Sequence, residues 1–430
     1  MSILDQIPDR PRSLIRRVIP LHDDFVKQSS IVFSASMIAN ICNYIYQIFV
    51  GRTLGPEAYG VFGALFAIFY LIGVFTGAIQ AGVGLFVSQF KANGEEDRIN
   101  SFLRQLIIKS IMLGIAGFLI FALISPWIAA FLNIDSTWEI VIIGTVFLFT
   151  FLLPVTTGAL QGLQHFKAMS AQNIISTGGK LAFGIILVVI GFGVYGALGA
   201  VTLGSFAGTI YCLYVIRARL RKGAIGSSHN FSELYRYSGL TLLVVFCLNV
   251  PSNLDVILVK HFLSNYDAGL YVSASVLGKI VLFMSGAIAV VLFPKVAELY
   301  THNQDTRPIL NRSLLLTGAL SGIVTAGLIL FPGIVGVLFG KAYLDAKTIT
   351  IVYAIMMFAF SLTTVIAQYS LAIRNLRFAY LLLAVTVLEM AGVWFIHGSV
   401  LEVAGMLMGM NILLSIASYF FVVWRRPSSD

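Results

Sequence analysis

Charged side chains are scarce in this sequence. Lys, Arg, Asp and Glu make up 11% of the 430 residues, while 58% of the residues are hydrophobic. Water-soluble domains contain about 25% charged and about 45–50% apolar residues. The composition therefore excludes a soluble enzyme and predicts a protein that lies within a membrane.

Residues that usually hold metals or cofactors are also few. The three cysteines, Cys42, Cys212 and Cys247, lie in apolar runs without paired spacing, which excludes a disulfide framework and a cysteine metal site. None of the six histidines approaches metal-ligand spacing, and no glycine-rich phosphate loop leads into Lys-Ser or Lys-Thr. We therefore expect no cofactor, no ATP-driven motor and no enzymatic activity.

Long apolar runs dominate the rest of the chain. A helix needs about 20 mostly apolar residues to cross the hydrocarbon core of a bilayer. The sequence offers twelve such runs, at 29–51, 58–89, 103–132, 139–163, 170–191, 195–216, 238–262, 268–297, 310–339, 346–372, 377–397 and 400–424. We therefore expect an all-α integral membrane protein with twelve transmembrane helices.

The distribution of positive charge predicts the orientation of these helices. If the amino terminus is cytoplasmic, 22 of the 28 Lys and Arg residues fall on the inside, and two more fall within spans. The outside segments then hold only Arg52, Lys260, Lys341 and Lys347. Because cytoplasmic loops carry the excess of Lys and Arg, both termini are expected in the cytoplasm and the protein in the cell (inner) membrane. The net charge of +9 then indicates contact with anionic membrane lipids rather than with nucleic acid.

The longest polar break, Arg217 to Asn230, separates six spans from six. We expect five parts: a cytoplasmic segment 1–28, an N-terminal lobe 29–216, a cytoplasmic linker 217–237, a C-terminal lobe 238–424 and a tail 425–430. In the first part, Leu14, Ile15, Val18 and Ile19 share one helical face. That segment is either an interfacial amphipathic helix or a frayed basic tail.

A weak internal repeat relates the two halves. A shift of 209 residues places Asn40 on Asn249 and Gly60 on Gly269. In both halves a long apolar run ends in a basic residue, crosses a short outside turn and restarts near a glycine. Six spans per half give both lobes the same topology, so we expect a parallel repeat, with a translocation path between the two six-helix lobes.

The turn after the first span carries a recognisable pattern. The chain reads Gly51-Arg52-Thr53-Leu54-Gly55-Pro56-Glu57-Ala58-Tyr59-Gly60-Val61-Phe62. This resembles the signature of the polysaccharide biosynthesis flippases, in which Arg-x-Leu-Gly-Pro leads to Tyr-Gly at the second span. The stretch Asn265-Tyr266-Asp267-Ala268-Gly269-Leu270-Tyr271, and Phe293-Pro294 before Glu298, are also similar to that family. These flippases are the polysaccharide transporter branch of the multidrug/oligosaccharidyl-lipid/polysaccharide exporter superfamily.

The resemblance implies a flippase that moves a polyprenyl-pyrophosphate-linked oligosaccharide from the inner to the outer leaflet by alternating access. A gradient of H⁺ or Na⁺ would drive it, and a polysaccharide polymerase or glycosyltransferases of the same pathway would be its partners. Lipid II flippases of the superfamily usually have two more helices than this chain. Two alternatives remain: a multidrug cation antiporter, which intramembrane lysines disfavour, and a membrane polymerase or glycosyltransferase, which the short outside connections disfavour.

Two lysines lie at membrane depth, where an ionisable group costs about 2.5–3.5 kcal/mol on insertion scales unless it meets water or a partner. Lys180 shares a helical face with Asn173, Thr177 and Gly184, which favours a cavity lining over a lipid-facing position. Lys279 has a similar, thinner stripe, and the two lysines come from opposite halves. We hypothesise that both hold the substrate's pyrophosphate. The competing interpretation is that each lysine snorkels or pairs locally with a carboxylate.

Two carboxylates, Asp255 and Glu389, also lie within expected spans. A carboxylate with amide and hydroxyl neighbours can bind Na⁺ or a proton, so both are candidates for ion coupling. An interlobe ion pair for Asp255, and a salt bridge to a lysine for Glu389, are the alternatives. Pro251 is expected to kink the span that contains Asp255.

Amide side chains complete the candidate substrate site. Asn40, Asn43 and Gln47 recur at steps of three and four in the first span, so they lie on one helical face. They provide hydrogen bonds suited to sugar hydroxyls, although such residues also join neighbouring helices. The full set of substrate-binding candidates is Lys180, Lys279, Arg52, Asn40, Asn43, Gln47, Asn173 and Asn249.

Overall fold

The computed structural model describes residues 23–222, 246–302, 304–373, 375 and 377–423. Every regular element in these ranges is a helix. The α-helices are α2 (Asp23–Ala92), α3 (Glu96–Leu132), α4 (Thr137–Gly144), α5 (Phe147–Thr150), α6 (Leu152–Gly162), α7 (Phe166–Leu187), α8 (Gly193–Lys222), α10 (Pro251–Phe262), α11 (Asn265–Thr301), α12 (Arg307–Leu330), α13 (Ile334–Phe339), α14 (Lys347–Ala372), α15 (Arg377–Phe395) and α16 (Val400–Val423). A π-helical turn, η2 (Val188–Phe192), and a 3₁₀-helix, η3 (Lys341–Ala346), join some of them.

Nine of the described helical segments are long and apolar enough to cross a membrane. Two of them, Ser30–Ala92 and Phe166–Arg217, run for 63 and 52 residues. Since one crossing needs about 20 residues, each is long enough for two crossings. The all-α, multi-pass membrane fold is thus confirmed, while the total of twelve spans and the side on which the termini lie stay predictions.

Glycines interrupt both of these long segments. In α2 the helical geometry fails at Gly55, where φ is +77°, and Pro56 follows at once. Residues with a side chain rarely adopt such a φ, and proline suits the first turn of the helix that restarts. Between α7 and α8, Gly191 and Gly193 also have positive φ, of +105° and +53°. The Gly55-Pro56 pair therefore forms the turn that the sequence pattern predicts.

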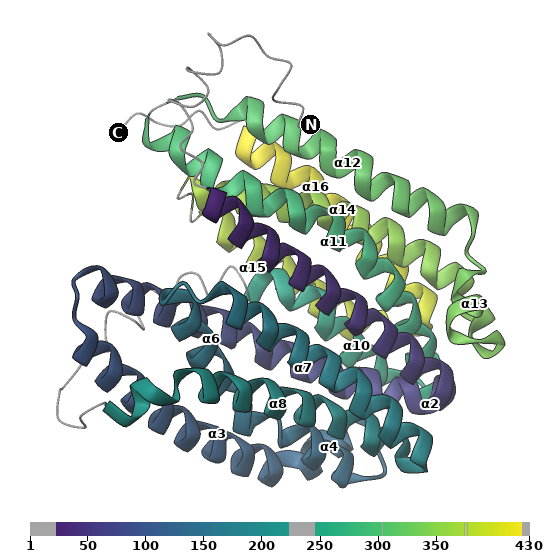
Figure 1. Cartoon of the computed structure of the whole chain (residues 1–430). Coiled ribbons are helices and arrows are strands. Elements are labelled where there is room, and N and C mark those ends of the chain that lie inside the picture. The colour runs from purple at the N-terminus through teal and green to yellow at the C-terminus, as the bar shows by residue number, and fades with distance from the viewer. Residues whose placement is uncertain (1–22, 223–245, 303, 374, 376, 424–430) are drawn as a thin grey trace, which may run out of the picture.

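The helices form two groups with α2 between them (Figure 1). One group contains α3 to α8, and the other contains α10 to α16. The first half of the sequence packs mainly within the first group and the second half mainly within the second, while α2 packs on α6, α7 and α8 and also on α10 and α11. The expected linker 217–237 lies mostly outside the described residues, as does most of the expected segment 1–28, so the five-part division stays a prediction.

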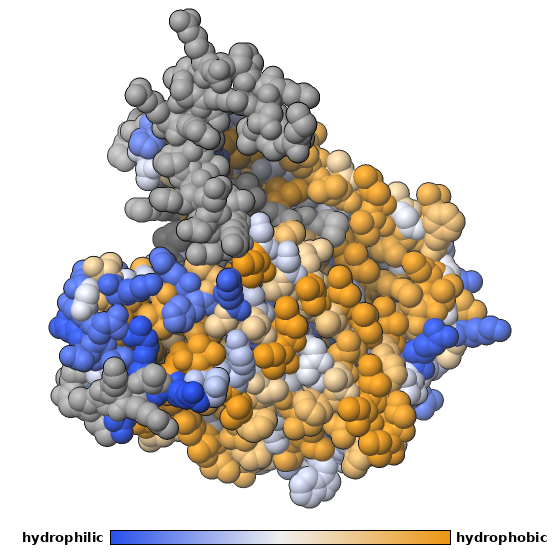
Figure 2. Space-filling view, in the orientation of Figure 1, coloured by the Kyte–Doolittle hydropathy of each residue, from blue (hydrophilic) through white to orange (hydrophobic). Residues whose placement is uncertain are grey.

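The outer surface is apolar. Large side chains such as Leu123, Val189 and Leu330 are exposed, with 70%, 69% and 72% of their surface accessible. Figure 2 shows hydrophobic residues across the middle of the molecule and hydrophilic residues gathered towards two ends. A soluble protein would bury such a surface, so the hydrocarbon core of a bilayer is the environment that fits it.

Helix α2 closely approaches α11 at a pair of glycines. A Cβ atom added to Gly60 in α2 would lie 2.2 Å from the carbonyl oxygen of Asn265. A Cβ atom added to Gly269 in α11 would lie 1.9 Å from the carbonyl oxygen of Pro56. These two positions are 209 residues apart, the shift that relates the halves of the sequence. The close approach of α2 and α11 therefore depends on having no side chain at either crossing position.

Candidate functional site

A cavity of about 340 Å³ lies between α2 and the start of the second helix group, and we call it the central cavity. It is lined by Asn40, Asn43, Tyr44, Gln47, Tyr70, Asn249, Ser252, Asn253, Val276, Lys279, Leu282 and Phe283. Five predicted site residues are in this set: Asn40, Asn43, Gln47, Asn249 and Lys279. The structure thus brings residues from both halves of the sequence to one polar, cationic space.

Lys279 supplies the positive charge of the central cavity. It is half-buried on α11, and its Nζ atom donates a hydrogen bond to Oδ1 of Asn253 at 3.3 Å. An ammonium group has three donors, so the group can also donate to a ligand in the cavity. The alternative interpretation was local pairing with a carboxylate. Asp255 interacts with Lys279 electrostatically, but no direct ion pair joins them in the described residues.

Lys180 lies behind the wall of the central cavity. Its side chain is 7% exposed, and its Nζ atom donates to Oδ1 of Asn43. The same Nζ lies 4.8 Å from the centre of the Tyr46 ring and 5.2 Å from that of the Phe66 ring, at cation–π distances. Lys180 therefore reaches the cavity only through Asn43, whose amide it orients.

Arg52 and Asn173 lie elsewhere. Arg52 is exposed, and its Nη1 atom donates to the carbonyl oxygens of Val337 and Leu338, at 3.2 and 3.5 Å, near the end of α13. It does not line the central cavity, so its predicted role in substrate binding has no geometric support here. Asn173 lines a different cavity.

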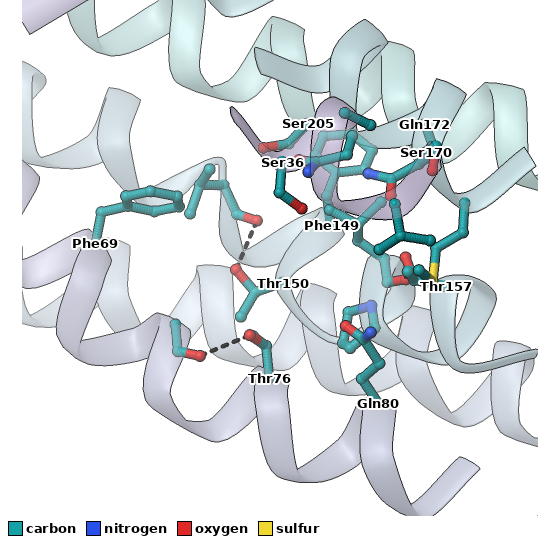
Figure 3. Close-up of a pocket in the computed structure, with 18 residues that line it drawn as sticks. Ser36, Phe69, Thr76, Gln80, Phe149, Thr150, Thr157, Ser170, Gln172 and Ser205 are labelled. Atoms are coloured by element: carbon teal, nitrogen blue, oxygen red, sulfur yellow. Dashed lines mark hydrogen bonds between the residues drawn. The ribbon is translucent and has the colours of Figure 1, made fainter. Parts of the chain in front are cut away.

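That second cavity, which we call the polar cavity, measures about 390 Å³ and lies among α2, α5, α6, α7 and α8. Figure 3 shows side chains from several helices, including Ser36, Thr150 and Gln80, converging on it. Its lining is Val32, Ala35, Ser36, Phe69, Gly73, Thr76, Gln80, Val146, Phe149, Thr150, Leu153, Pro154, Thr157, Met169, Ser170, Gln172, Asn173 and Ser205. The lining is rich in hydroxyl and amide groups, and none of its described residues has an ionisable side chain. Of this set, only Asn173 was predicted from the sequence as a site residue.

Asp255 is fully buried on α10 and is not among the residues that line either cavity. Its Oδ2 atom accepts hydrogen bonds from the hydroxyls of Tyr271 and Tyr353, each at 2.9 Å. Its Oδ1 atom has no partner among the described residues. The helix that carries it begins at Pro251, which suits a first helical position because proline has no N–H group to leave unpaired.

Glu389 lies on α15, 1% exposed. Its Oε1 atom accepts a hydrogen bond from Nδ2 of Asn411 at 2.7 Å, while Oε2 of Glu389 and Oδ1 of Asn411 have no partner among the described residues. Glu389 interacts electrostatically with Asp255. The expected salt bridge from Glu389 to a lysine is not present in the described residues.

The partners of these carboxylates were not predicted from the sequence. Asn411 is a polar residue within an apolar run, which is a signal of function at membrane depth. Tyr271 ends the stretch that resembles the flippase family, but neither it nor Tyr353 stood out as a partner, because tyrosines are common at the membrane interface.

Hydrogen bonds at the ends of α3 and α10 join the two helix groups. Lys260 is fully buried, and its Nζ donates to the carbonyl oxygens of Leu132 and Asn133, the latter at 3.2 Å. Asn133 ends α3 in the left-handed conformation, and its Nδ2 donates to the carbonyl oxygen of His261 at 2.9 Å. The carbonyl end of a helix carries partial negative charge, so the Lys260 ammonium stabilises this contact.

Comparisons with known proteins agree with this fold. A family model described as "Polysaccharide biosynthesis protein" matches residues 49–348. The probable multidrug resistance protein YoeA of Bacillus subtilis is 20% identical over an aligned length of 432 positions, and the match covers 91% of this chain and 92% of YoeA.

Two kinds of transporter resemble the chain in structure. An inward-facing multidrug resistance MATE transporter of the MOP superfamily superposes with a TM-score of 0.78 at 14% identity, over 91% of this chain and 96% of that one. The lipid II flippase MurJ in an inward closed conformation gives a TM-score of 0.71 at 16% identity, over 92% and 88% of the two chains. At these identities the similarity establishes the fold alone.

Proposed function

The chain belongs to the polysaccharide biosynthesis protein family, and from that premise we propose that it is a flippase for polyprenyl-pyrophosphate-linked oligosaccharides, working by alternating access. The observation that carries the proposal is the central cavity, where Lys279 from one half of the chain faces Asn40, Asn43 and Gln47 from the other. A pyrophosphate is anionic and cannot enter a membrane without a compensating charge. The half-buried ammonium of Lys279 supplies that charge.

The amides of the cavity fit the rest of the headgroup. Asparagine and glutamine side chains both donate and accept hydrogen bonds, as sugar hydroxyls do. Lys180 fixes Asn43 from behind, so one amide of this wall is held in place before a ligand arrives. A preorganised donor costs less entropy on binding than a free side chain. The cavity is therefore suited to a ligand that carries both phosphate and sugar.

We further propose that Asp255 and Glu389 couple transport to a gradient of H⁺ or Na⁺. Two buried carboxylates that interact electrostatically repel each other when both are ionised, and a bound proton or cation relieves that repulsion. One oxygen atom of each carboxylate, Oδ1 of Asp255 and Oε2 of Glu389, lacks a hydrogen-bond partner among the described residues, and so does Oδ1 of Asn411. Oxygen atoms of this kind bind a proton or a hard cation.

Transport in proteoliposomes tests the proposal. A fluorescent polyprenyl-pyrophosphate oligosaccharide would be incorporated, and its flipping followed with and without H⁺ and Na⁺ gradients. We expect gradient-dependent flipping that Lys279→Gln abolishes. Lys295→Gln, on the same helix but in an exposed pair with Glu298, serves as the matched control and should be silent, because exposed pairs contribute little. Absence of flipping with every sugar donor tried would overturn the proposal.

The similarity to YoeA and to a MATE transporter favours a second candidate, multidrug export. Such transporters often take cationic substrates, which acidic cavities attract and a lysine repels. Neither the central cavity nor the polar cavity is lined by Asp or Glu within the described ranges. Ethidium efflux from the same proteoliposomes separates the two functions, and the flippase proposal expects none.

A further inference from the structure

The polar cavity has the chemistry of a carbohydrate site rather than of an ion site. None of the 18 described residues that line it is ionisable. Nine of them carry a hydroxyl or amide group: Ser36, Thr76, Gln80, Thr150, Thr157, Ser170, Gln172, Asn173 and Ser205. The volume of about 390 Å³ falls within the range of small-molecule pockets, about 300–1,000 Å³. It is large enough for one or two sugar rings.

Several of these polar groups keep hydrogen-bonding capacity for a ligand. The Oγ of Ser170 is buried and has no partner among the described residues. Thr150 and Thr157 each donate to the carbonyl oxygen four residues earlier, at 3.0 and 2.8 Å, so their hydroxyl oxygens remain able to accept. A buried polar group without a partner costs free energy, and sugar hydroxyls would satisfy these atoms. Figure 3 also shows Phe69 and Phe149 at this cavity, and aromatic rings can cover the apolar face of a sugar.

Neighbouring turns of α2 line the two cavities, and α7 passes from the polar cavity to the wall of the central one. On α2, Ser36 lines the polar cavity, and Asn40, one turn further along, lines the central one. On α7, Asn173 lines the polar cavity, and Lys180, two turns further along, bonds Asn43 in the wall of the central cavity. Residues at these spacings share one helical face. A ligand with its phosphates beside Lys279 would therefore extend along these faces into the polar cavity.

We propose that the polar cavity is the subsite for the first sugars of the lipid-linked chain, and that it selects uncharged or N-acetylated sugars over acidic ones. The inference rests on the proposed flippase function and extends it. The pyrophosphate lies in the central cavity, and the sugars hydrogen-bond to Gln172, Asn173 and Ser170. A uronic acid would be disfavoured because no described residue of the lining offers its carboxylate a cation.

Equilibrium binding to the purified full-length protein in detergent tests this inference. The probes are a fluorescent C20 polyprenyl pyrophosphate without sugar, and the same lipid carrying N-acetylglucosamine, a neutral disaccharide or a uronic acid. The test variants are Gln172→Leu with Asn173→Leu, which keeps side-chain size and removes both amides, and the milder Ser170→Ala with Ser205→Ala. Asn311→Leu, in an apolar groove among α12, α14 and α16, is the matched control.

We expect the wild-type protein to bind a neutral glycosylated lipid at least tenfold more tightly than the bare lipid. The double leucine variant should lose that advantage and bind the bare lipid as the wild type does. The double alanine variant should lose about half of the affinity advantage on a logarithmic scale. The control should keep the full advantage. Three results would overturn the subsite. The first is that no neutral sugar improves binding, and the second is that the uronic acid improves binding as much or more. The third is that a folded variant loses affinity equally for bare and glycosylated lipids.

Failure of the proposed function itself would look different. If Lys279→Gln binds both lipids as tightly as the wild type does, the pyrophosphate site is wrong, whatever the sugar dependence. If Lys279→Gln weakens both lipids equally while the leucine variant weakens only the glycosylated one, both the function and the subsite are supported. Thermal melting of each variant checks that it is folded.

Discussion

Lys180 and Lys279 look alike in the sequence, but the structure gives them different surroundings. Lys279 lines the central cavity, whereas Lys180 is buried behind Asn43 and beside two aromatic rings. We predict that Lys279→Gln lowers affinity for polyprenyl pyrophosphate at least tenfold, or about 1.4 kcal/mol. Lys180→Gln should lower affinity less and instead lower the melting temperature, because a desolvated cation–π contact contributes about 2 kcal/mol. Titration and melting curves of both variants measure this, and the reverse ranking of affinities would contradict it.

Asp255 and Glu389 are predicted to govern coupling rather than binding. In Asp255→Asn the side chain no longer changes charge, so flipping should lose its dependence on the H⁺ or Na⁺ gradient while substrate affinity is retained. Glu389→Gln should act in the same direction. Flipping rates under imposed gradients provide the measurement, and an unchanged gradient dependence in both variants would show that the coupling site lies elsewhere.

His165 gives a control for the pH dependence. It lies at the start of α7, and partial burial, with Arg219 and Lys91 nearby, lowers its pKa below the usual value of 6.5. A histidine with a lowered pKa is neutral at pH 7 and gains its charge only at more acidic pH. His165→Gln should therefore leave the pH profile of flipping unchanged above pH 6.5, so a change in that range would implicate this residue as well.

At the level of single residues, the sequence predicted more of the central cavity than of its surroundings. Polar residues at membrane depth are costly, so Asn40, Asn43 and Lys279 were visible as candidates. Arg52 had the right charge but lies at a helix end, where it donates to backbone carbonyls. The polar cavity could not be predicted, because serines and threonines fit into membrane helices by bonding their own backbone and so give no distinct signal.

Among the elements, the crossing of α2 and α11 depends on glycine. A Cβ at Gly269 would lie 1.9 Å from a backbone oxygen, which cannot move as a flexible side chain can. We predict that Gly269→Ala destabilises the protein by about 1–3 kcal/mol, the usual cost of overpacking. Gly286→Ala, on the same helix with nothing within 4 Å of the added atom, is the control. It should be neutral or stabilising by up to about 1 kcal/mol, because alanine favours helix.

Melting of the two alanine variants in the same detergent compares them directly. Equal melting temperatures would mean that α2 and α11 can separate at this point without cost. The all-α membrane fold was predicted, since long apolar runs leave little choice in a membrane. Two breaks lie where the sequence separates neighbouring apolar runs. Gly55-Pro56 lies between the runs 29–51 and 58–89, and Gly191 and Gly193 lie at the boundary of the runs 170–191 and 195–216.

For the whole molecule, the two helix groups are held together at the ends of α3 and α10. From sequence, Lys260 was only one of the few outside charges, and its burial could not be foreseen because it depends on Leu132 and Asn133, over 120 residues away. Alternating access requires contacts that hold one side closed and then release. Lys260 is suited to this role, since it bridges the two groups by hydrogen bonds to carbonyl oxygens, which can break and form again.

We predict that Lys260→Met shifts the protein towards a state in which these ends are apart. A cation at the carbonyl end of a helix contributes up to about 2 kcal/mol when partly buried, and losing that amount changes the ratio of two states about 30-fold. Spin labels on Asp135→Cys and Asn265→Cys, with the three native cysteines replaced by alanine, would report the separation by pulsed electron resonance. Lys347→Met, an exposed lysine on α14, is the matched control. We expect a longer distance component in the Lys260 variant alone, because only that change removes the partner of the α3 carbonyls. Identical distance distributions in both variants would show that this contact does not hold the molecule closed.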